Sequence, residues 1–251
     1  MIFLKNKNVL VTGGSRGIGK ACVELFIEAG ANVAFTFQSA EKEANKLIAD
    51  YTGVSKLRKY KLNLSDVIEI DKVMRSVLSD FENIDILVNN AGIWKEAAID
   101  KMTLEEWNEM MNVNLTSTYL ITKFLVPEMK KNKFGRIINI ASTAGQRGEA
   151  FHSHYAASKG GMISLTKSLA TELGKFNITV NCVAPGWVFT DMTTDSLADN
   201  ETYKKVVSDI PLNKIAKPEE IAGPVLFLAS DLASHITGEI LNVNGGSVLC
   251  G

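Results

Sequence analysis

The sequence predicts an α/β fold: a doubly wound, Rossmann-type parallel sheet of about seven strands with helices on both faces. Two observations carry this prediction. Short apolar runs alternate with longer segments of helical spacing, and a glycine-rich loop follows the first run. Strands that recur after helical crossovers form parallel sheets with right-handed connections. No linker-like tract or fixed-period repeat interrupts the alternation, so we expect residues 1–251 to form a single domain.

The expected elements follow in chain order. The apolar runs predicted as strands occupy residues 8–13, 32–37, 57–62, 84–89, 136–142, 178–186 and 239–246. Helical spacing of apolar residues places helices at 17–29, 41–51, 66–81, 103–130 and 155–174. The segment 187–217 is polar and follows a Pro-Gly turn. We expect it to form two short helices in a mobile flap, since such segments often close over ligands.

Composition excludes several classes of protein. The charge is almost balanced, with 27 basic and 28 acidic residues, and no basic run could follow a phosphate backbone, which argues against a nucleic-acid partner. Cys22, Cys182 and Cys250 lack the spacing of metal ligands, so we expect reduced thiols and no metal site. The first residues lack a signal-peptide pattern, and no run of about 18 apolar residues occurs. We therefore expect a cytoplasmic protein without membrane contact.

The loop TGGSRGIG, at residues 12–19, joins the first predicted strand to the first predicted helix. Glycines allow a tight turn and a close ligand, and the helix N-terminus offers free N–H groups to a pyrophosphate. Such glycines could also serve strand-to-helix packing alone. The loop follows the first strand of a βαβ unit, which favours a dinucleotide site. The expected contacts are Gly13, Ser15, Arg16, Gly17, Ile18 and Gly19.

The end of the second predicted strand indicates which dinucleotide binds. NAD sites usually present a carboxylate to the adenosine ribose at this point. Here Gln38 and Ser39 follow the strand, and no acid occurs before Glu41. Arg16 with the neutral donors Ser15, Gln38 and Ser39 suits a 2′-phosphate, because a guanidinium binds phosphate oxygens in bidentate fashion. The sequence thus predicts NADP(H), the alternative being that Arg16 is a solvated loop cation.

The segment HYAASK, at residues 154–159, places Tyr155 and Lys159 four residues apart. On a helix these positions lie on the same face, one above the other. The same spacing arises by chance on ordinary helix surfaces. Near neutral pH a tyrosine keeps its proton and can donate it to the oxygen of a carbonyl that is being reduced. A neighbouring ammonium would stabilise the phenolate left behind and lower the pKa of the phenol.

These residues resemble the short-chain dehydrogenase/reductase family over essentially the whole chain. The matching motifs are TGGSRGIG at 12–19, NNAG at 89–92, NVNL around Asn114, NIAS ending at Ser142, YAASK at 155–159, PG at 185–186 followed by Thr190, and VNGG at 243–246. Several ordered motifs at family-like spacing are far more specific than any one of them.

The resemblance implies a catalytic centre of Ser142, Tyr155 and Lys159, with Asn114 completing a proton relay. Ser142 would orient the substrate oxygen, while Asn114 would kink its helix and hold a water that links Lys159 to solvent. The cofactor contacts implied beyond the glycine loop are Asn63 near the adenine, Asn90 and Gly92 beside the ribose, Tyr155 and Lys159 at the nicotinamide ribose, and Val188 and Thr190 at the carboxamide. Asn89 is expected to be structural.

The resemblance also implies a homotetramer, with the helices 103–130 and 155–174 at one interface and the C-terminal VNGGSVLCG near another. Small residues at 156, 157, 160 and 161 would let the cofactor or a partner helix approach closely. A carrier protein could contact Lys130 and Lys131.

Three functions are compatible with these residues. The first is an NADP(H)-dependent carbonyl reductase acting on 3-oxoacyl thioesters of acyl carrier protein. The second is a dehydrogenase of a sugar, polyol or other secondary alcohol, and the third is an idle nucleotide-binding regulator, against which the intact Ser142, Tyr155 and Lys159 argue. Trp94, Phe151, Trp187 and Met192 could cover an apolar acyl chain.

Two departures from carrier-protein reductases concern the substrate. The run 148–154, GEAFHSH, replaces a segment that commonly contains Asn, Gln and glycines, and Thr171 stands where an arginine is often found. His152 and His154 could line the substrate mouth, but histidines in a polar loop are more often surface residues.

Overall fold

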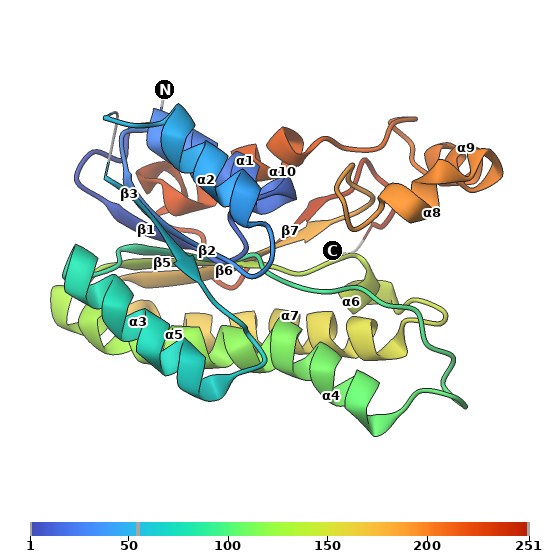
Figure 1. Cartoon of the computed structure of the whole chain (residues 1–251), viewed down its shortest axis with the longest axis horizontal. Coiled ribbons are helices and arrows are strands. Elements are labelled where there is room, and N and C mark those ends of the chain that lie inside the picture. The colour runs from blue at the N-terminus through green and yellow to red at the C-terminus, as the bar shows by residue number, and fades with distance from the viewer. Residues whose placement is uncertain (1, 54–55, 250–251) are drawn as a thin grey trace.

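The described residues, 2–53 and 56–249 of a computed structural model, form a seven-stranded parallel sheet with the strand order β3-β2-β1-β4-β5-β6-β7 (Figure 1). The strands are β1 (Asn8–Val11), β2 (Asn32–Phe37), β3 (Leu57–Lys61), β4 (Ile86–Asn89), β5 (Gly135–Ile140), β6 (Ile178–Pro185) and β7 (Ile240–Val243). The ends of each strand lie within three residues of the ends of a run that the sequence predicts as a strand. The doubly wound fold is therefore confirmed.

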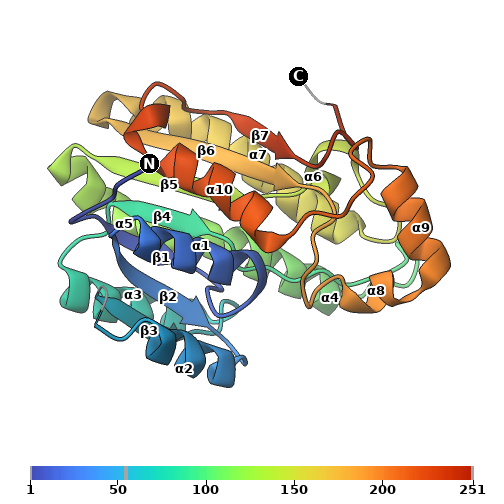
Figure 2. The same ribbon diagram turned by 90° about the horizontal axis from the view of Figure 1, so that it is seen from above.

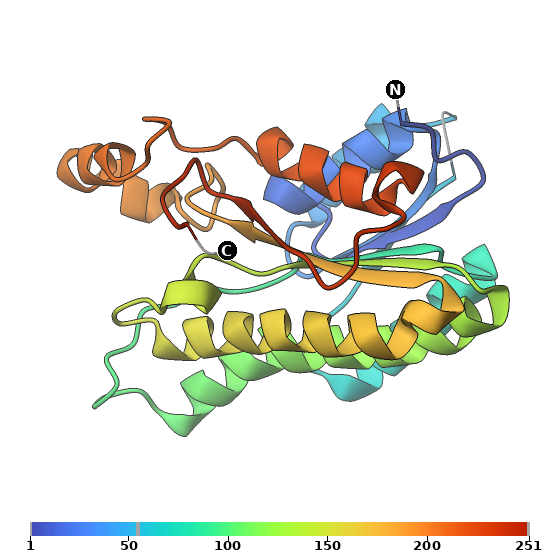
Figure 3. The same ribbon diagram turned by 180° about the vertical axis from the view of Figure 1, so that it is seen from behind.

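Helices cover both faces of this sheet (Figures 1 and 3). One face carries α1 (Gly17–Glu28), α2 (Glu41–Asp50) and α10 (Pro218–Ala229), and the other carries α3 (Val67–Phe81), α5 (Ser117–Asn132) and α7 (Ser153–Leu173). Alternate residues of β1 supply the two cores: Val9 and Val11 pack with α1 and α10, and Leu10 packs with α3 and α5. Burial on both faces explains why the strands read as continuous apolar runs.

The predicted helix 103–130 is divided in three. It consists of α4 (Leu104–Met111), a π-helical turn η1 (Asn112–Thr116) and α5. The Ser117 N–H donates to the Asn112 carbonyl, and the hydroxyls of Ser117 and Thr118 bond the carbonyls of Val113 and Asn114 at 2.6 and 3.0 Å. Hydroxyl bonds of this kind relax the regular helical ladder. The change from α-helix to π-helix therefore takes place around Asn114, where a kink is expected.

Helix α10 was not expected from the sequence, because its two prolines obscure the helical spacing. Pro218 stands in its first turn, where a missing N–H is harmless, and Pro224 lies inside the helix. Within 187–217 the structure contains α8 (Thr194–Ala198) and α9 (Asn200–Ser208), so the two short helices are confirmed.

The carboxyl ends of the strands all open on one edge, where α6 (Ala144–Arg147), α8 and α9 lie beyond the arrowheads (Figure 2). The strand order reverses between β1 and β4, so a crevice is expected at that edge, at the point where open α/β sheets bind ligands. Along the described ranges no helix has both the length and the apolar character needed to cross a bilayer.

Candidate active site

A cavity of about 450 Å³ opens at this edge of the sheet. Its walls are the glycine loop after β1, the ends of β2, β4 and β5, the start of α7, and the segment 185–193 after β6. Its volume is within the range of pockets that bind small molecules and cofactors. Residues far apart in the chain therefore meet around one ligand-sized space.

The glycine loop is shaped for the close approach of a ligand. Gly17 has φ +52°, and a Cβ on Gly19 would lie 2.2 Å from the Gly13 carbonyl oxygen. Helix α1 begins here with no side-chain cap from Arg16 and no acid in its first turn. Its first N–H groups are thus left for an anion at the cavity, which fits the pyrophosphate of a dinucleotide.

Asn90 ties this loop to the neighbouring strand. Its Nδ2 donates to the carbonyls of Thr12 and Gly13 at 2.9 and 3.2 Å, and its side chain also borders the cavity. Asn90 therefore holds the glycine loop in place and also faces the space for a ligand. Asn89, in contrast, bonds Asn139 of β5 at 2.9 Å and is buried, as expected for a structural residue.

Most residues predicted to contact the cofactor line the cavity: Gly13, Ser15, Arg16, Gly17, Ile18, Gly19, Gln38, Ser39, Asn90, Gly92, Tyr155, Lys159, Val188 and Thr190. Asn63 is the exception. The residues on either side of it, Leu62 and Leu64, line the cavity, but the Asn63 Oδ1 accepts the Ser65 N–H at 3.1 Å in a local turn. A motif fixes the position of such a residue along the chain and not the direction of its side chain.

Arg16 reaches across the cavity mouth. Its Nη1 lies 3.1 Å from Asp191 Oδ2, with both side chains more than half exposed. Beside this pair, a Cβ on Gly17 would lie 3.2 Å from Thr190 Cγ2. The glycine loop and the segment after β6 are thus in contact, and Asp191 is a wall residue that the sequence motifs did not indicate.

Ser142, Tyr155 and Lys159 all line the cavity. Ser142 follows β5, while Tyr155 and Lys159 lie on one face of α7 with the Lys159 Nζ 5.8 Å from the centre of the Tyr155 ring. The Lys159 ammonium is buried and donates to the Ile140 carbonyl at 2.7 Å. Ser142 Oγ accepts the Ala144 N–H at 3.1 Å, so the hydroxyl also caps the turn.

Burial controls the titration of both groups on α7. It raises the pKa of the Tyr155 phenol to about 12, while hydrogen bonding from Ser142 acts in the opposite direction and the Glu149 charge adds to the rise. Burial also lowers the pKa of Lys159 to about 8. The expected lowering of the Tyr155 pKa is not seen in this structure, because desolvation of the phenolate is the largest contribution. The phenol is therefore a firmly protonated donor.

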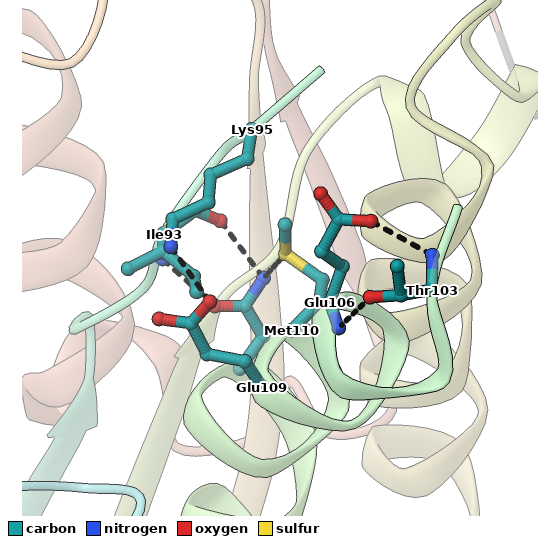
Figure 4. A network of polar contacts seen from close by, with 7 residues as sticks. Ile93, Lys95, Thr103, Glu106, Glu109 and Met110 are labelled. Atoms are coloured by element: carbon teal, nitrogen blue, oxygen red, sulfur yellow. Dashed lines mark hydrogen bonds and ion pairs between the residues drawn. The ribbon is translucent and has the colours of Figure 1, made fainter. Parts of the chain in front are cut away.

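Asn114 lies behind the cavity wall and is fully buried. Its Oδ1 accepts the Ile93 N–H at 2.9 Å, and its Nδ2 donates to the Ile93 carbonyl at 3.0 Å and to Ser158 Oγ at 3.1 Å. Ile93 and Met110, both in contact with this carboxamide, lie side by side in Figure 4. A Cβ on Gly92 would lie 3.1 Å from Asn114 Oδ1 and 3.4 Å from Lys159 Nζ. Asn114 and Lys159 therefore face the same small gap.

The start of α4 orients the helix that carries Asn114. Thr103 and Glu106 form a reciprocal capping box, with hydrogen bonds of 3.2 and 2.8 Å that Figure 4 shows. Such a box satisfies two N–H groups that would otherwise lack partners at the helix start.

The small residues on α7 serve packing within the chain. A Cβ on Gly160 would lie 3.1 Å from the Gly145 carbonyl oxygen, and one on Gly161 would lie 2.7 Å from Leu115 of η1. Within the chain, the elements that approach these two glycines are thus α6 and η1.

The substrate mouth differs from expectation at three residues. Trp94, Trp187 and Met192 line the cavity, but Phe151 does not line it and is 61% exposed. His152 and His154 are buried rather than on the surface, and neither lines the cavity. The burial of His152 follows from packing against Trp94, distant in sequence, which loop polarity does not reveal. Four charged cavity residues were missed, because no motif contains them: Lys95, Arg147, Glu149 and Asp191.

The cysteines that the structure describes, Cys22 and Cys182, are buried free thiols, and burial raises the pKa of each to about 12. Cys250 lies outside the described residues. Within the described ranges no three His, Cys, Asp or Glu side chains are grouped as metal ligands.

The fold and this site define a nicotinamide-dependent oxidoreductase, and the chain belongs to the short-chain dehydrogenase/reductase family. The family model described as Enoyl-(Acyl carrier protein) reductase matches residues 13–247. The crystal structure of gox2181 has a TM-score of 0.92 at 31% identity, over 98% of this chain and 96% of that one.

Curated relatives cover nearly the whole chain. The 3-oxoacyl-[acyl-carrier-protein] reductase FabG of Aquifex aeolicus is 43% identical over 98% of both chains. The reductase of the same name from Vibrio harveyi is 43% identical over 97% of this chain and 98% of its own, and that from Thermotoga maritima is 40% identical over 98% and 99%.

Proposed function

We propose that this chain reduces the 3-oxo group of an acyl thioester on acyl carrier protein to a 3-hydroxyl group with NADPH. The observation that carries the proposal is that Ser142, Tyr155 and Lys159 face the same cavity as the uncapped start of α1. The start of α1 would hold the pyrophosphate of the cofactor, and Tyr155 would supply the proton within the same cavity. The names of the relatives, 40–43% identical, support this substrate.

NADPH supplies a hydride to the carbonyl carbon, and the residues of this chain handle the proton. Tyr155 donates its hydroxyl proton to the carbonyl oxygen, which Ser142 Oγ orients by a hydrogen bond. The Lys159 ammonium stabilises the phenolate that forms. Asn114, which shares a gap with Lys159, holds the polar path through which a proton returns. These four assignments are part of the proposal.

The preference for NADPH is proposed on charge. Arg16 lies at the cavity beside Gln38 and Ser39, and no acidic side chain lines this end of β2 among the described residues. A 2′-phosphate would therefore meet a guanidinium and neutral donors instead of a carboxylate.

Lys130 and Lys131 are proposed to contact the carrier protein. Both stand near the end of α5, and each already has an acidic neighbour, Glu172 at 3.6 Å for Lys130 and Glu128 at 3.3 Å for Lys131. These exposed pairs contribute about 0–1 kcal/mol each and could exchange for acids of a partner.

Three further features belong to the proposal: a single domain, a cytoplasmic location and a homotetramer. Exposed Leu104 and Tyr119, on α4 and α5, support an interface along these helices. Sedimentation of the purified chain at two concentrations tests the tetramer.

A substrate panel tests the proposed function. NADPH oxidation is followed with an acetoacetyl thioester on carrier protein, the same thioester on coenzyme A, a small ketone and a keto-sugar. We expect efficient turnover of the thioesters, and Lys130→Glu with Lys131→Glu should weaken only the carrier-protein substrate. Turnover of the keto-sugar without thioester activity would identify a sugar dehydrogenase and overturn the proposal.

A further inference from the structure

Glu149 places a carboxylate in the wall of the candidate active site. It stands in the connection between α6 and α7 and lines the same cavity as Ser142 and Tyr155. Its side chain is 24% exposed, so water screens it only partly. Its charge is the smallest of the contributions that raise the pKa of the Tyr155 phenol, after desolvation by burial.

A neighbouring histidine lies beside this carboxylate and fixes the backbone of its loop. The Glu149 Oε1 lies 3.8 Å from His152 Nδ1, which bonds the Ala150 carbonyl at 3.0 Å, and the backbone N–H of His152 donates to the Glu149 carbonyl at 3.2 Å. His152 is buried, and its ring is stacked on Trp94 at 4.4 Å with an angle of 3° between the planes. Trp94 in turn meets the edge of Trp187 at 6.1 Å. The loop is thus anchored to the aromatic wall of the cavity.

The cations of the cavity do not neutralise Glu149. Lys95 is paired with Glu109 at 2.6 Å, and Arg16 is paired with Asp191. The Lys159 ammonium donates to the Ile140 carbonyl, and Arg147 is exposed to solvent.

We propose that Glu149 is a specificity-determining residue that rejects substrates with a negative charge next to the reacting carbonyl. In a 3-oxo thioester or ester, the acyl carbon C1, two carbons from the reacting ketone, is uncharged. In a free 3-oxo acid the same carbon is a carboxylate. Two like charges several ångströms apart in a partly desolvated site disfavour binding by a factor on the order of ten. This inference rests on the carbonyl reduction proposed above and adds the reason for accepting thioesters.

A matched pair of small substrates tests the inference. Ethyl acetoacetate and acetoacetate share the reacting ketone and differ in charge, and kcat/KM is measured for both with NADPH. We expect Glu149→Gln to raise the ratio of kcat/KM for acetoacetate to kcat/KM for the ester about tenfold, because any effect on Tyr155 is common to both substrates. Glu96→Gln is the control, because Glu96 is exposed nearby and does not line the cavity. An ester-to-acid ratio that is the same in wild type and Glu149→Gln overturns the inference.

The wild-type chain offers an independent readout. Added salt screens Glu149, so the relative kcat/KM for acetoacetate should rise with ionic strength. A flat or falling salt dependence counts against the inference, even if Glu149→Gln fails to fold. The two proposals fail differently: a wild type that reduces neither the ester nor a thioester contradicts the proposed function. A wild type that reduces these substrates, together with a Glu149→Gln variant whose ester-to-acid ratio of kcat/KM is unchanged, contradicts only the role of Glu149.

Discussion

Replacing Lys159 by methionine should remove one pH dependence of folding. Burial lowers the pKa of Lys159 from 10.5 to about 8. Between these values the unfolded chain holds a proton that the folded chain has released, so the stability of the wild type rises with pH. Methionine has a similar length and does not titrate. Relative to Lys159→Met, the wild type should therefore gain stability as pH rises from 8 to 10.5.

The size of the effect follows from the shift in pKa. One pKa unit corresponds to about 1.4 kcal/mol, so the full window contributes about 3 kcal/mol. Cys182, the neighbouring titratable group, stays protonated over this range, because burial raises its pKa to about 12. Its contribution to the pH dependence of stability is thus the same in the wild type and in Lys159→Met, and it cancels when the two free energies of unfolding are subtracted.

Urea unfolding followed by circular dichroism, at fixed protein concentration and at several pH values from 7.5 to 10, measures the difference. Lys167→Met is the control, since Lys167 is exposed on the same helix. We expect the difference in free energy of unfolding between wild type and the control to stay constant over this pH range. If the difference between wild type and Lys159→Met is also independent of pH, Lys159 is not a desolvated cation.

Three further predictions concern the cofactor, the proton donor and a loop. Tyr155→Phe should retain NADPH affinity by fluorescence titration and lose about 10²–10⁴-fold in kcat, and near-normal turnover would exclude Tyr155 as the donor. Arg16→Ala with Gln38→Asp should lower the ratio of kcat/KM with NADPH to kcat/KM with NADH. Equal use of both cofactors by the wild type would contradict the proposed 2′-phosphate site. Phe151 has φ +62° and is exposed, so Phe151→Gly should stabilise the chain by about 1 kcal/mol in thermal unfolding, whereas Ala150→Gly should not.

The sequence determined the architecture because its signals are local. Apolar runs that alternate with helical spacing predict the strands without knowledge of their neighbours, and β2 spans the predicted residues 32–37. The glycine loop and the pair Tyr155 and Lys159 are similarly local, since a turn or one helical face fixes how these residues lie relative to one another. Motif order then indicated which segments meet at the cavity.

The missed and misplaced features depend on contacts between distant segments. His152 is buried because Trp94, more than fifty residues earlier, stacks on it. Gly161 is small because Leu115 of η1 occupies the adjacent space. Asn63 does not line the cavity, because its carboxamide oxygen accepts the Ser65 N–H and a weak hydrogen bond from the cavity residue Gln38.

Tertiary structure alone also decided the electrostatics of the site. Glu149, in a polar loop, could have been a solvated surface acid, and the packing of His152 on Trp94 anchors this loop at the cavity that Glu149 lines. Desolvation depends on every atom packed around a group, so the pKa shifts of Tyr155 and Lys159 appear only when α7 is packed against the sheet. Sequence spacing brings a phenol and an ammonium together, but burial sets their protonation.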